Sequence, residues 1–316
     1  MENANRAETR LHEKIRRELG PDFMSALDDQ LTIEIMLNPD GELWQERLGE
    51  PMKRIGQLSA SQADAAIRTV AGCLNKTATQ DNPILEGVFP LDGSRIACWL
   101  PPITKSPSFA LRKHASRVFT LDNYLESGTL TDNQVLAIRS AVQEHRNILV
   151  IGGTGSGKTT LCNAVIAEIT KQNPTERIFI IEDTGEIQCQ AKNAVQLCTS
   201  IHVSMTKLLE TTLRGRPDRI LVGEVRSAAA LDLLDAWNTG HEGGIATLHA
   251  NNAREALDRL KSLITRHESA PKEIEPLIGK VVHMIIHIAK TESGRRVKEI
   301  IEVQGFHNGI YQVQTM

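Results

Sequence analysis

Aromatic residues and excess charge are both scarce in this chain. Of its 316 residues only 3% are Phe, Trp or Tyr, and the formal net charge is -3. A protein that moves along single-stranded nucleic acid needs a basic channel and usually aromatic side chains on which bases stack. The composition supplies little of either. We therefore expect no direct nucleic-acid binding, although this net charge is compatible with a local basic patch.

Long apolar runs and paired cysteines are also missing. No run approaches the roughly 18 apolar residues of a membrane-spanning helix, so any membrane contact is expected to be peripheral. The charged N-terminal segment lacks the apolar region of a secretory signal. The five cysteines form no C-x-x-C pair. An odd number of unpaired cysteines favours reduced thiols in a cytoplasmic protein over a disulfide framework or a zinc site.

The chain is long enough for two domains, and its first part predicts a small α/β domain of mixed character. The expected elements are a helix over 1–20 stopped by Gly20 and Pro21, strands over 32–37 and 43–48, a helix over 61–74, and a hairpin over 84–90 and 95–100. Proline and serine then become frequent, which is typical of a linker. We assign residues 1–105 to this domain and residues 106–125 to the linker.

Residues 126–316 predict a second α/β domain, because strands and helices alternate there. Such alternation is typical of a doubly wound, mostly parallel sheet. The expected strands cover 148–151, 178–181, 220–222, 245–248 and 281–288, followed by an antiparallel hairpin over 297–303 and 310–313 with its turn at 307–309.

The strongest motif is GGTGSGKTT at 152–160, directly after the apolar run 148–151. It satisfies G-x-x-x-x-G-K-[ST] between a strand and a helix, which predicts a loop that binds a nucleoside triphosphate. The expected ligand-binding residues are Gly153, Thr154, Gly155, Ser156, Gly157, Lys158, Thr159 and Thr160. Lys158 is expected to reach the outer phosphates and the Thr159 hydroxyl to bind Mg²⁺.

Acidic residues follow two other predicted strands. Glu224 ends the run RILVGE and is the expected catalytic acid, because ligands of doubly wound sheets lie beyond the carboxyl ends of the strands. Gly223 stands where a complete Walker B pair has aspartate, so Mg²⁺ must depend more on other groups. Another strand ends with three acids, Glu182, Asp183 and Glu186, and one of them is a candidate for the metal or its waters. The alternative is that Asp183 caps a helix or a turn.

Histidines and arginines complete the candidate site. The run TGHEGGIATLHA places His241 before and His249 after a predicted strand, and its glycines suggest a close backbone approach. We favour a functional role for His249, as a neutral group that contacts the γ-phosphate or Glu224, and leave His241 open. Arginines occur around Glu224 and in the first domain, but the sequence does not choose which of them contact phosphate.

The motifs GGTGSGKTT, IIEDTGEIQ, LRGRPDRILVGEVR and TGHEGGIATLHAN occur in the order and at the spacing of the secretion ATPase superfamily. They resemble its Walker A motif, Asp box, degenerate Walker B motif and His box. The segments DGSRIACWLPP and PSFALRK are similar to its N-terminal domain and linker, so the resemblance covers nearly the whole chain. Within the superfamily the sequence resembles the traffic ATPases of type IV secretion and conjugation, since the tetracysteine motif of type II assembly ATPases is absent.

This resemblance implies a PAS-like N-terminal domain joined to a RecA-like ATPase domain, with ATP and Mg²⁺ held between them. It implies a homohexamer on the cytoplasmic face of the inner membrane that acts with other secretion components to power pilus assembly or substrate transfer. Matched motif by motif, it also implies functional residues. These are Lys158, Glu224 and His249 for catalysis, Thr159, Glu182 and Asp183 for the metal, and Arg95 and Arg112 for phosphate contact.

Two other functions stay open on the sequence alone. A ring helicase shares the RecA-like core, but the scarcity of aromatic residues argues against it. An ATP-gated scaffold with slow hydrolysis is the second alternative, and it is motivated by glycine in place of aspartate at position 223.

Overall fold

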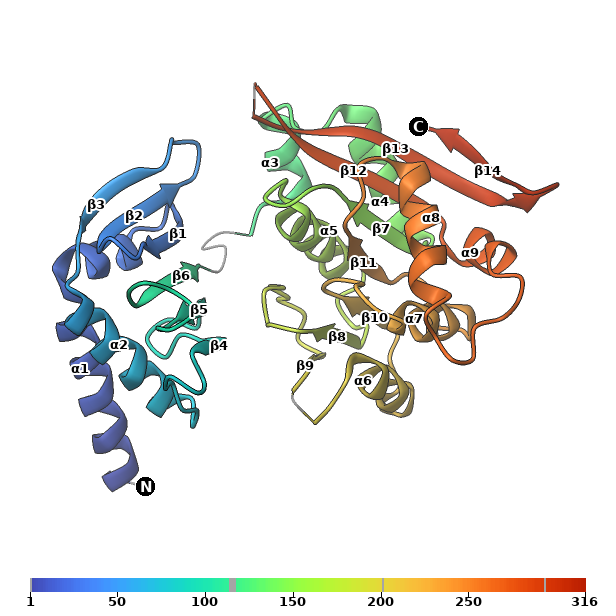
Figure 1. The fold of residues 1–316 in the computed structure, drawn as a ribbon. Coiled ribbons are helices and arrows are strands. Elements are labelled where there is room, and N and C mark those ends of the chain that lie inside the picture. Colours follow the sequence, from blue (N-terminus) through green and yellow to red (C-terminus); the bar gives the residue numbers. More distant parts are fainter. Residues whose placement is uncertain (1, 114–117, 201, 293) are drawn as a thin grey trace. The chain divides into compact units, whose positions relative to one another are not determined.

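A computed structural model describes residues 2–113, 118–200, 202–292 and 294–316. These residues form two compact units, the first ending at Lys113 and the second beginning at Val118. Each unit has its own sheet (Figure 1). Each unit also has its own buried core. None of the described helices combines the length and the apolar character needed to cross a bilayer.

The first unit is a six-stranded antiparallel sheet with the strand order β3-β2-β1-β6-β5-β4. Two helices share a core with the inward-facing side chains of this sheet. The elements are α1 (Glu2–Asp28), β1 (Thr32–Leu37), β2 (Glu42–Arg47), β3 (Lys53–Gln57), α2 (Ala60–Cys73), β4 (Ile84–Val88), β5 (Arg95–Trp99) and β6 (Ser108–Arg112).

The first helix does not stop at Gly20 as predicted. Gly20 has φ 76° and ψ 175°, which kinks the chain, but helix α1 resumes and ends at Asp28. Pro21 is tolerated because it begins the second helical segment, where its missing N–H group has no intrahelical partner to lose. Burial of Phe23 and Leu27 in the core gives this second segment its stability.

The segment 108–112, which sequence analysis placed in the linker, is strand β6 of the first sheet. It pairs with β1 on one side and with β5 on the other. Phe109 and Leu111 are buried, so this strand contributes to the core. Strand β3, which the sequence pattern missed, is an edge strand that exposes Lys53 and Arg54 and shows no clear apolar alternation.

The second unit has an eight-stranded sheet with the order β14-β13-β12-β7-β11-β10-β8-β9. The strands from β12 to β9 are parallel, and β13 and β14 add an antiparallel ribbon at one edge (Figure 1). The elements are α3 (Leu121–Glu126), α4 (Asp132–Gln143), β7 (Ile148–Ile151), α5 (Lys158–Gln172), β8 (Ile178–Glu182), β9 (Ala194–Cys198), α6 (Met205–Thr212), η1 (Leu213–Gly215), β10 (Arg219–Val222), α7 (Ala229–Asn238), β11 (Ile245–Leu248), α8 (Ala253–Ile264), α9 (Glu275–Val281), β12 (Met284–Thr291), β13 (Gly294–His307) and β14 (Ile310–Thr315).

This unit confirms the predicted doubly wound α/β architecture with a closing hairpin. The strand expected over 281–288 begins instead at Met284, because Val281 ends helix α9. Side chains alternate between two cores. Ile148 and Val150 pack with α3, α4 and α5, whereas Leu149 and Ile151 pack with α6, α7, α8 and α9. Burial on both faces explains why the central strands read as continuous apolar runs.

Candidate functional site

The glycine loop lies where the parallel strands end. Strand β7 pairs in parallel with β12 and β11, so residues 152–157 open at the carboxyl edge of the sheet. A Cβ atom on Gly152 would lie 2.2 Å from the carbonyl oxygen of Ile288, and Gly157 precedes α5 with φ 97°. Both positions therefore require glycine. A loop curled in this way directs backbone N–H groups at a phosphate.

Lys158 begins helix α5 and folds back over the loop. Its Nζ donates hydrogen bonds of 2.9 Å to the carbonyl oxygens of Gly152 and Gly153. The same Nζ lies 3.4 Å from both ring nitrogens of His249. Because a lysine stem is flexible and its three donors rotate, this ammonium group can exchange loop carbonyls for phosphate oxygens.

Glu224 lies beyond strand β10, at the same edge of the sheet. Its Oε1 is 3.2 Å from Nε2 of His249, and its Oε2 contacts the guanidinium of Arg226. Burial opposes ionisation, but the hydrogen bond and charge of Arg226, with the charge of Lys158, hold the pKa of Glu224 below its usual value. Glu224 is thus a carboxylate that can orient a water molecule or accept its proton.

His249 follows strand β11 and connects the lysine to the acid. Burial and the charge of Lys158 lower the pKa of its imidazole, although Glu224 opposes this shift. The ring is therefore neutral at pH 7, and one of its nitrogens donates while the other accepts. The structure brings Lys158, Glu224 and His249 into contact, and the His249 side chain is 42% exposed.

The two acids after strand β8 have different surroundings. Glu182 is buried, and its Oε1 accepts hydrogen bonds from the backbone N–H groups of Glu186 (3.0 Å) and Ile187 (2.9 Å). Burial raises the pKa of Glu182 to about 7, against these two hydrogen bonds. Asp183 is exposed and accepts a 3.0 Å hydrogen bond from the Thr199 hydroxyl. Of the two, Asp183 is the carboxylate open to solvent.

Glu182 also gives a physical reason for glycine at position 223. A Cβ atom on Gly223 would lie 2.9 Å from Cγ and 3.1 Å from Oε1 of Glu182. An aspartate there would meet a buried carboxyl group at van der Waals distance or less, and two acids so close would repel when ionised. The buried Glu182 on the neighbouring strand therefore explains why position 223 has glycine and the Walker B pair is incomplete.

The loop residues fit a magnesium–triphosphate complex. In the part of the chain that the structure describes, no three His, Cys, Asp or Glu side chains are grouped to hold a metal ion by themselves. The loop instead offers Thr159, half-buried in the first turn of α5. Mg²⁺ commonly binds one or two protein groups together with phosphates and waters. A site with one hydroxyl and nearby carboxylates matches that preference.

The two arginines expected to contact phosphate lie together on the first sheet. Arg95 on β5 is directly opposite Arg112 on β6, and Arg112 is opposite Glu34 on β1. The nearest approach of Arg112 to Glu34 is 3.9 Å, between Nε and Oε1. Like charges opposite each other in antiparallel strands are destabilising, so a pair of this kind suits a site that receives an anion.

His241 and the glycines beside it lie at the other edge of the second sheet. Gly243 and Gly244 precede β11, and a Cβ atom on Gly244 would lie 2.0 Å from Nε1 of Trp237. The close approach that these glycines indicated is therefore to protein, not to nucleotide. Arg219, one of the arginines beside Glu224 in sequence, is also buried at this edge, where it pairs with Glu176.

Two other elements, which the sequence did not predict to be near the site, also contribute to the loop. Arg295 on β13 donates a 3.3 Å hydrogen bond to the carbonyl oxygen of Gly155. Helix α8 supplies Glu255 and Asp258 to a hollow of about 530 Å³ beside Gly152 and His249. Neither contribution follows a glycine-rich or strand-end pattern, so only spatial proximity identifies them.

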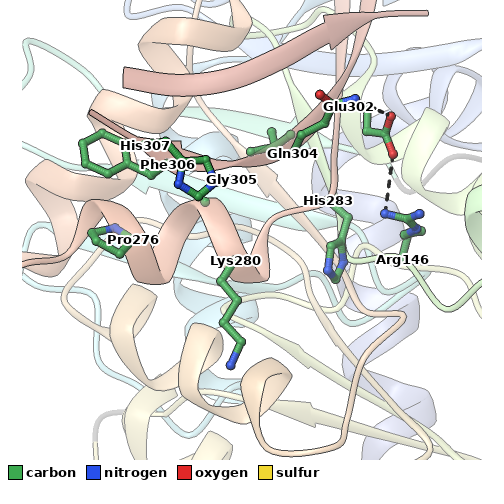
Figure 2. A pocket seen from close by; sticks show the side chains of 11 residues that line it. Arg146, Pro276, Lys280, His283, Glu302, Gln304, Gly305, Phe306 and His307 are labelled. Atoms are coloured by element: carbon green, nitrogen blue, oxygen red, sulfur yellow. Dashed lines mark hydrogen bonds and ion pairs between the residues drawn. The ribbon is translucent and has the colours of Figure 1, made fainter. Parts of the chain in front are cut away.

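A second hollow, of about 550 Å³, lies at the amino edge of the sheet (Figure 2). Arg146, Lys280 and His283 line it together with Glu302, which is 3.5 Å from the Arg146 guanidinium. Its lining residues include no part of the loop 152–160 and not Glu224. The residues expected to bind the triphosphate therefore lie at the carboxyl edge, not in this hollow.

Comparisons with known proteins identify the family of this chain. Residues 79–305 match the family described as Type II/IV secretion system protein. The chain is 48% identical over 310 residues to a probable conjugal transfer protein TrbB of Sinorhizobium fredii, covering 98% of this chain and 95% of that protein. It is 31% identical to the type IV secretion system protein PtlH of Bordetella pertussis, covering 88% and 91%. The Legionella pneumophila ATPase DotB has a similar fold, with a TM-score of 0.66 at 22% identity over 89% of this chain and 81% of that one.

Proposed function

Because the chain belongs to the type II/IV secretion system protein family, we propose that it is a traffic ATPase that hydrolyses ATP to power conjugal transfer or type IV secretion. The coarser class, an ATPase of type IV secretion and conjugation, follows from the family itself. The proposal adds that ATP is hydrolysed at this site and that the hydrolysis powers transfer or secretion.

The contact between Lys158, His249 and Glu224 carries the proposal. Lys158 neutralises charge on the outer phosphates when it leaves the loop carbonyls. Glu224, held as a carboxylate, positions the attacking water and takes its proton. His249 contacts both groups, so its neutral ring links the phosphate-binding lysine to the catalytic acid.

Bound Mg²⁺ would neutralise charge on the phosphates, with Thr159 as its protein ligand and with Glu182 or Asp183 reached through water. The exposure of Asp183 favours it for this role. Glu182 is proposed to act through the loop that it fixes, since its Oε1 is engaged by two backbone N–H groups.

We further propose that Arg95 and Arg112 contact the phosphates, so that ATP bridges the two domains. Their cross-strand position concentrates two cations on one face of the first sheet. Loss of the γ-phosphate would weaken such a bridge and allow the domains to move. We expect the protein to form a homohexameric ring. We also expect it to contact other secretion components and to lie peripherally on the inner membrane. The mass of the assembly with and without ATP tests the ring, since six copies are expected.

The decisive experiment replaces Lys158. Lys158→Ala should lower ATP turnover at least about 100-fold, because an interaction with the transferring phosphoryl group is lost. The control is Lys171→Ala, which removes the same charge from the exposed last turn of the same helix. Phosphate release gives the rate, and thermal melting shows whether each variant is folded. A folded Lys158→Ala protein with turnover equal to that of Lys171→Ala would refute hydrolysis at this loop.

A further inference from the structure

Arg295 reaches the phosphate loop from a different element. The hairpin of β12 and β13 returns the chain to the carboxyl edge of the sheet, where Arg295 Nη2 lies 3.3 Å from the carbonyl oxygen of Gly155. A Cβ atom on Gly157 would lie 3.0 Å from Cδ and 3.3 Å from Nε of Arg295. The arginine side chain therefore lies directly against the middle of the loop.

The hydrogen-bonding capacity of this arginine is only partly used. Among the residues that the structure describes, its Nε is buried and has no hydrogen-bond partner. The hydroxyl of Ser156, in the same loop, is also buried without a partner within these residues. Buried polar groups are normally paired, so two such groups, one in the loop and one on the strand beside it, point to a ligand that accepts hydrogen bonds. A phosphate oxygen is such an acceptor.

The charge of Arg295 is not cancelled by a nearby acid. Within the described chain no carboxylate lies at salt-bridge distance from it, whereas Arg226 pairs with Glu224 and Arg219 with Glu176. Burial raises the pKa of the Tyr124 phenol, and the charge of Arg295 opposes that shift. Arg295 therefore adds to the positive potential of the loop.

We propose that Arg295 is a nucleotide-binding residue that contacts the α- or β-phosphate and holds the turn at Gly155. The middle of such a loop surrounds these inner phosphates, while Lys158 reaches the outer ones. Arg295 thus stabilises bound ADP and ATP alike and takes no part in cleavage of the γ-phosphate. This inference rests on the proposed function and adds a phosphate contact from the ATPase domain itself, in contrast to Arg95 and Arg112.

The neighbouring residue provides a matched control. Arg296 lies on the same strand and carries the same charge, but its Nη1 donates a 3.1 Å hydrogen bond to the carbonyl oxygen of Ser127, between α3 and α4. Arg295→Ala and Arg296→Ala therefore make the same chemical change one residue apart. Only the first removes a contact with the phosphate loop.

The experiment measures ADP binding by calorimetry and ATP turnover for the two variants. Arg295→Ala should weaken ADP binding and raise KM for ATP about tenfold, equivalent to about 1.4 kcal/mol, with kcat within about twofold of the unmodified protein. Arg296→Ala should change each quantity by less than about twofold. Arg295→Lys, which keeps the charge without the planar fork, should fall between the two.

Two results would overturn the inference. One is ADP affinity in Arg295→Ala equal to that in Arg296→Ala. The other is a loss confined to kcat, which would give Arg295 a role in cleavage instead. If Arg295→Ala does not fold, the ADP affinity of Arg295→Lys is compared with that of Arg296→Ala instead. Equal affinities would again count against the inference. A failure of the proposed function would be recognised separately, because that function is tested by the ATP turnover of Lys158→Ala.

Discussion

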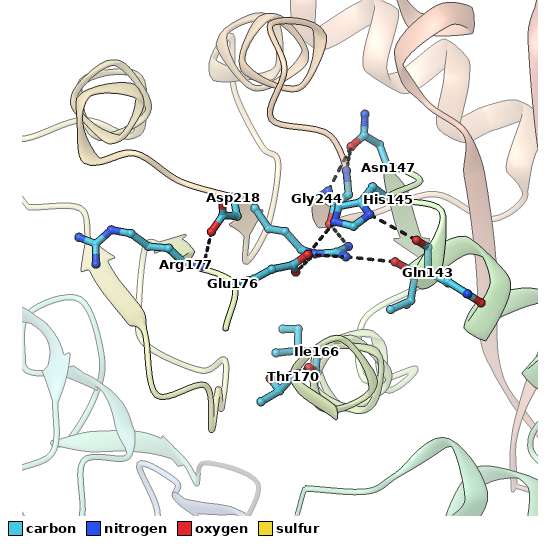
Figure 3. A network of polar contacts seen from close by, with 12 residues as sticks. Gln143, His145, Asn147, Ile166, Thr170, Glu176, Arg177, Asp218 and Gly244 are labelled. Carbon is cyan, nitrogen blue, oxygen red and sulfur yellow. Dashed lines mark hydrogen bonds and ion pairs between the residues drawn. The ribbon is translucent and has the colours of Figure 1, made fainter. Parts of the chain in front are cut away.

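The polar groups at the two edges of the second sheet differ in how deeply they are buried and in how completely they are paired. At the carboxyl edge, Lys158, Glu224 and His249 share contacts in a site that reaches solvent. At the amino edge, the Arg219 side chain is 1% exposed and pairs with Glu176. Figure 3 shows Glu176 close to His145 at this edge. A buried network whose members are all paired makes a fold specific and rigid. A partly exposed cluster with rearrangeable contacts is able to receive a charged substrate.

Arg219 uses most of its donors at the amino edge. Its Nε pairs with Glu176 at 2.5 Å, Nη1 donates to the carbonyl oxygen of Gly243 at 3.0 Å, and Nη2 donates to that of Val142 at 3.1 Å. These partners belong to the segments before β8 and β11 and to the end of helix α4. Asn147 adds to the edge, since its Oδ1 accepts from the N–H groups of Gly243 and Gly244.

The largest expected effect is on stability, from Arg219→Met. The substitution leaves the Glu176 carboxylate without its buried partner and should lower the free energy of unfolding by about 3–5 kcal/mol. Urea unfolding measures this change. Lys207→Met is the control, because its exposed pair with Glu210 should contribute less than about 1 kcal/mol. At low temperature the folded Arg219→Met protein should retain its turnover. If Arg219→Met lost turnover but kept its stability, the network of Arg219 and Glu176 would have a functional role. The amino edge would then no longer differ from the carboxyl edge in this respect.

The opposite behaviour is expected of Glu224→Gln at the carboxyl edge. Loss of the proposed catalytic carboxylate should lower kcat about 100-fold, equivalent to about 2.7 kcal/mol. ADP affinity and the melting temperature should change little, because the side chain keeps its shape at a partly exposed position. Glu210→Gln, in a surface pair, is the matched control. Unchanged turnover in Glu224→Gln would contradict the catalytic assignment and favour another base.

The carboxyl edge could be predicted from the sequence because its information is local. The loop at 152–160 follows an apolar strand and begins a helix, and Glu224 and His249 each follow another such strand. In a parallel sheet the ends of these strands meet at one edge, so a strand-end residue is placed without knowledge of its partners. The structure adds the distances between the groups and their burial.

Other features depend on contacts between distant parts of the chain. Strand β6 pairs with β1, more than 70 residues earlier, and its own five residues after a proline-rich stretch do not indicate a strand. The partner of Arg219 is 43 residues away, so the sequence showed only one arginine among several. Arg295 is 140 residues from Gly155. Such contacts depend on the tertiary fold, which no short pattern encodes.

The smallest expected effect is a pH dependence at the amino edge, from His283→Asn. Nδ1 of His283 accepts a 2.9 Å hydrogen bond from the backbone N–H of Asn147, and burial and the charge of Arg146 lower its pKa, against Glu242 and Glu302. Because the unfolded chain then binds a proton more readily than the folded one, His283 should reduce stability as the pH falls below about 6.5.

An asparagine in place of His283 keeps an acceptor near Nδ1 and does not titrate. The loss of stability between pH 7.5 and pH 5.5 should therefore be smaller in His283→Asn than in the unmodified protein, by up to about 1 kcal/mol. Urea midpoints at the two pH values measure this difference. His202→Asn makes the same substitution at an exposed turn and is the matched control. A larger loss of stability in His283→Asn than in the unmodified protein would contradict this prediction. It would show that protonated His283 stabilises the amino edge.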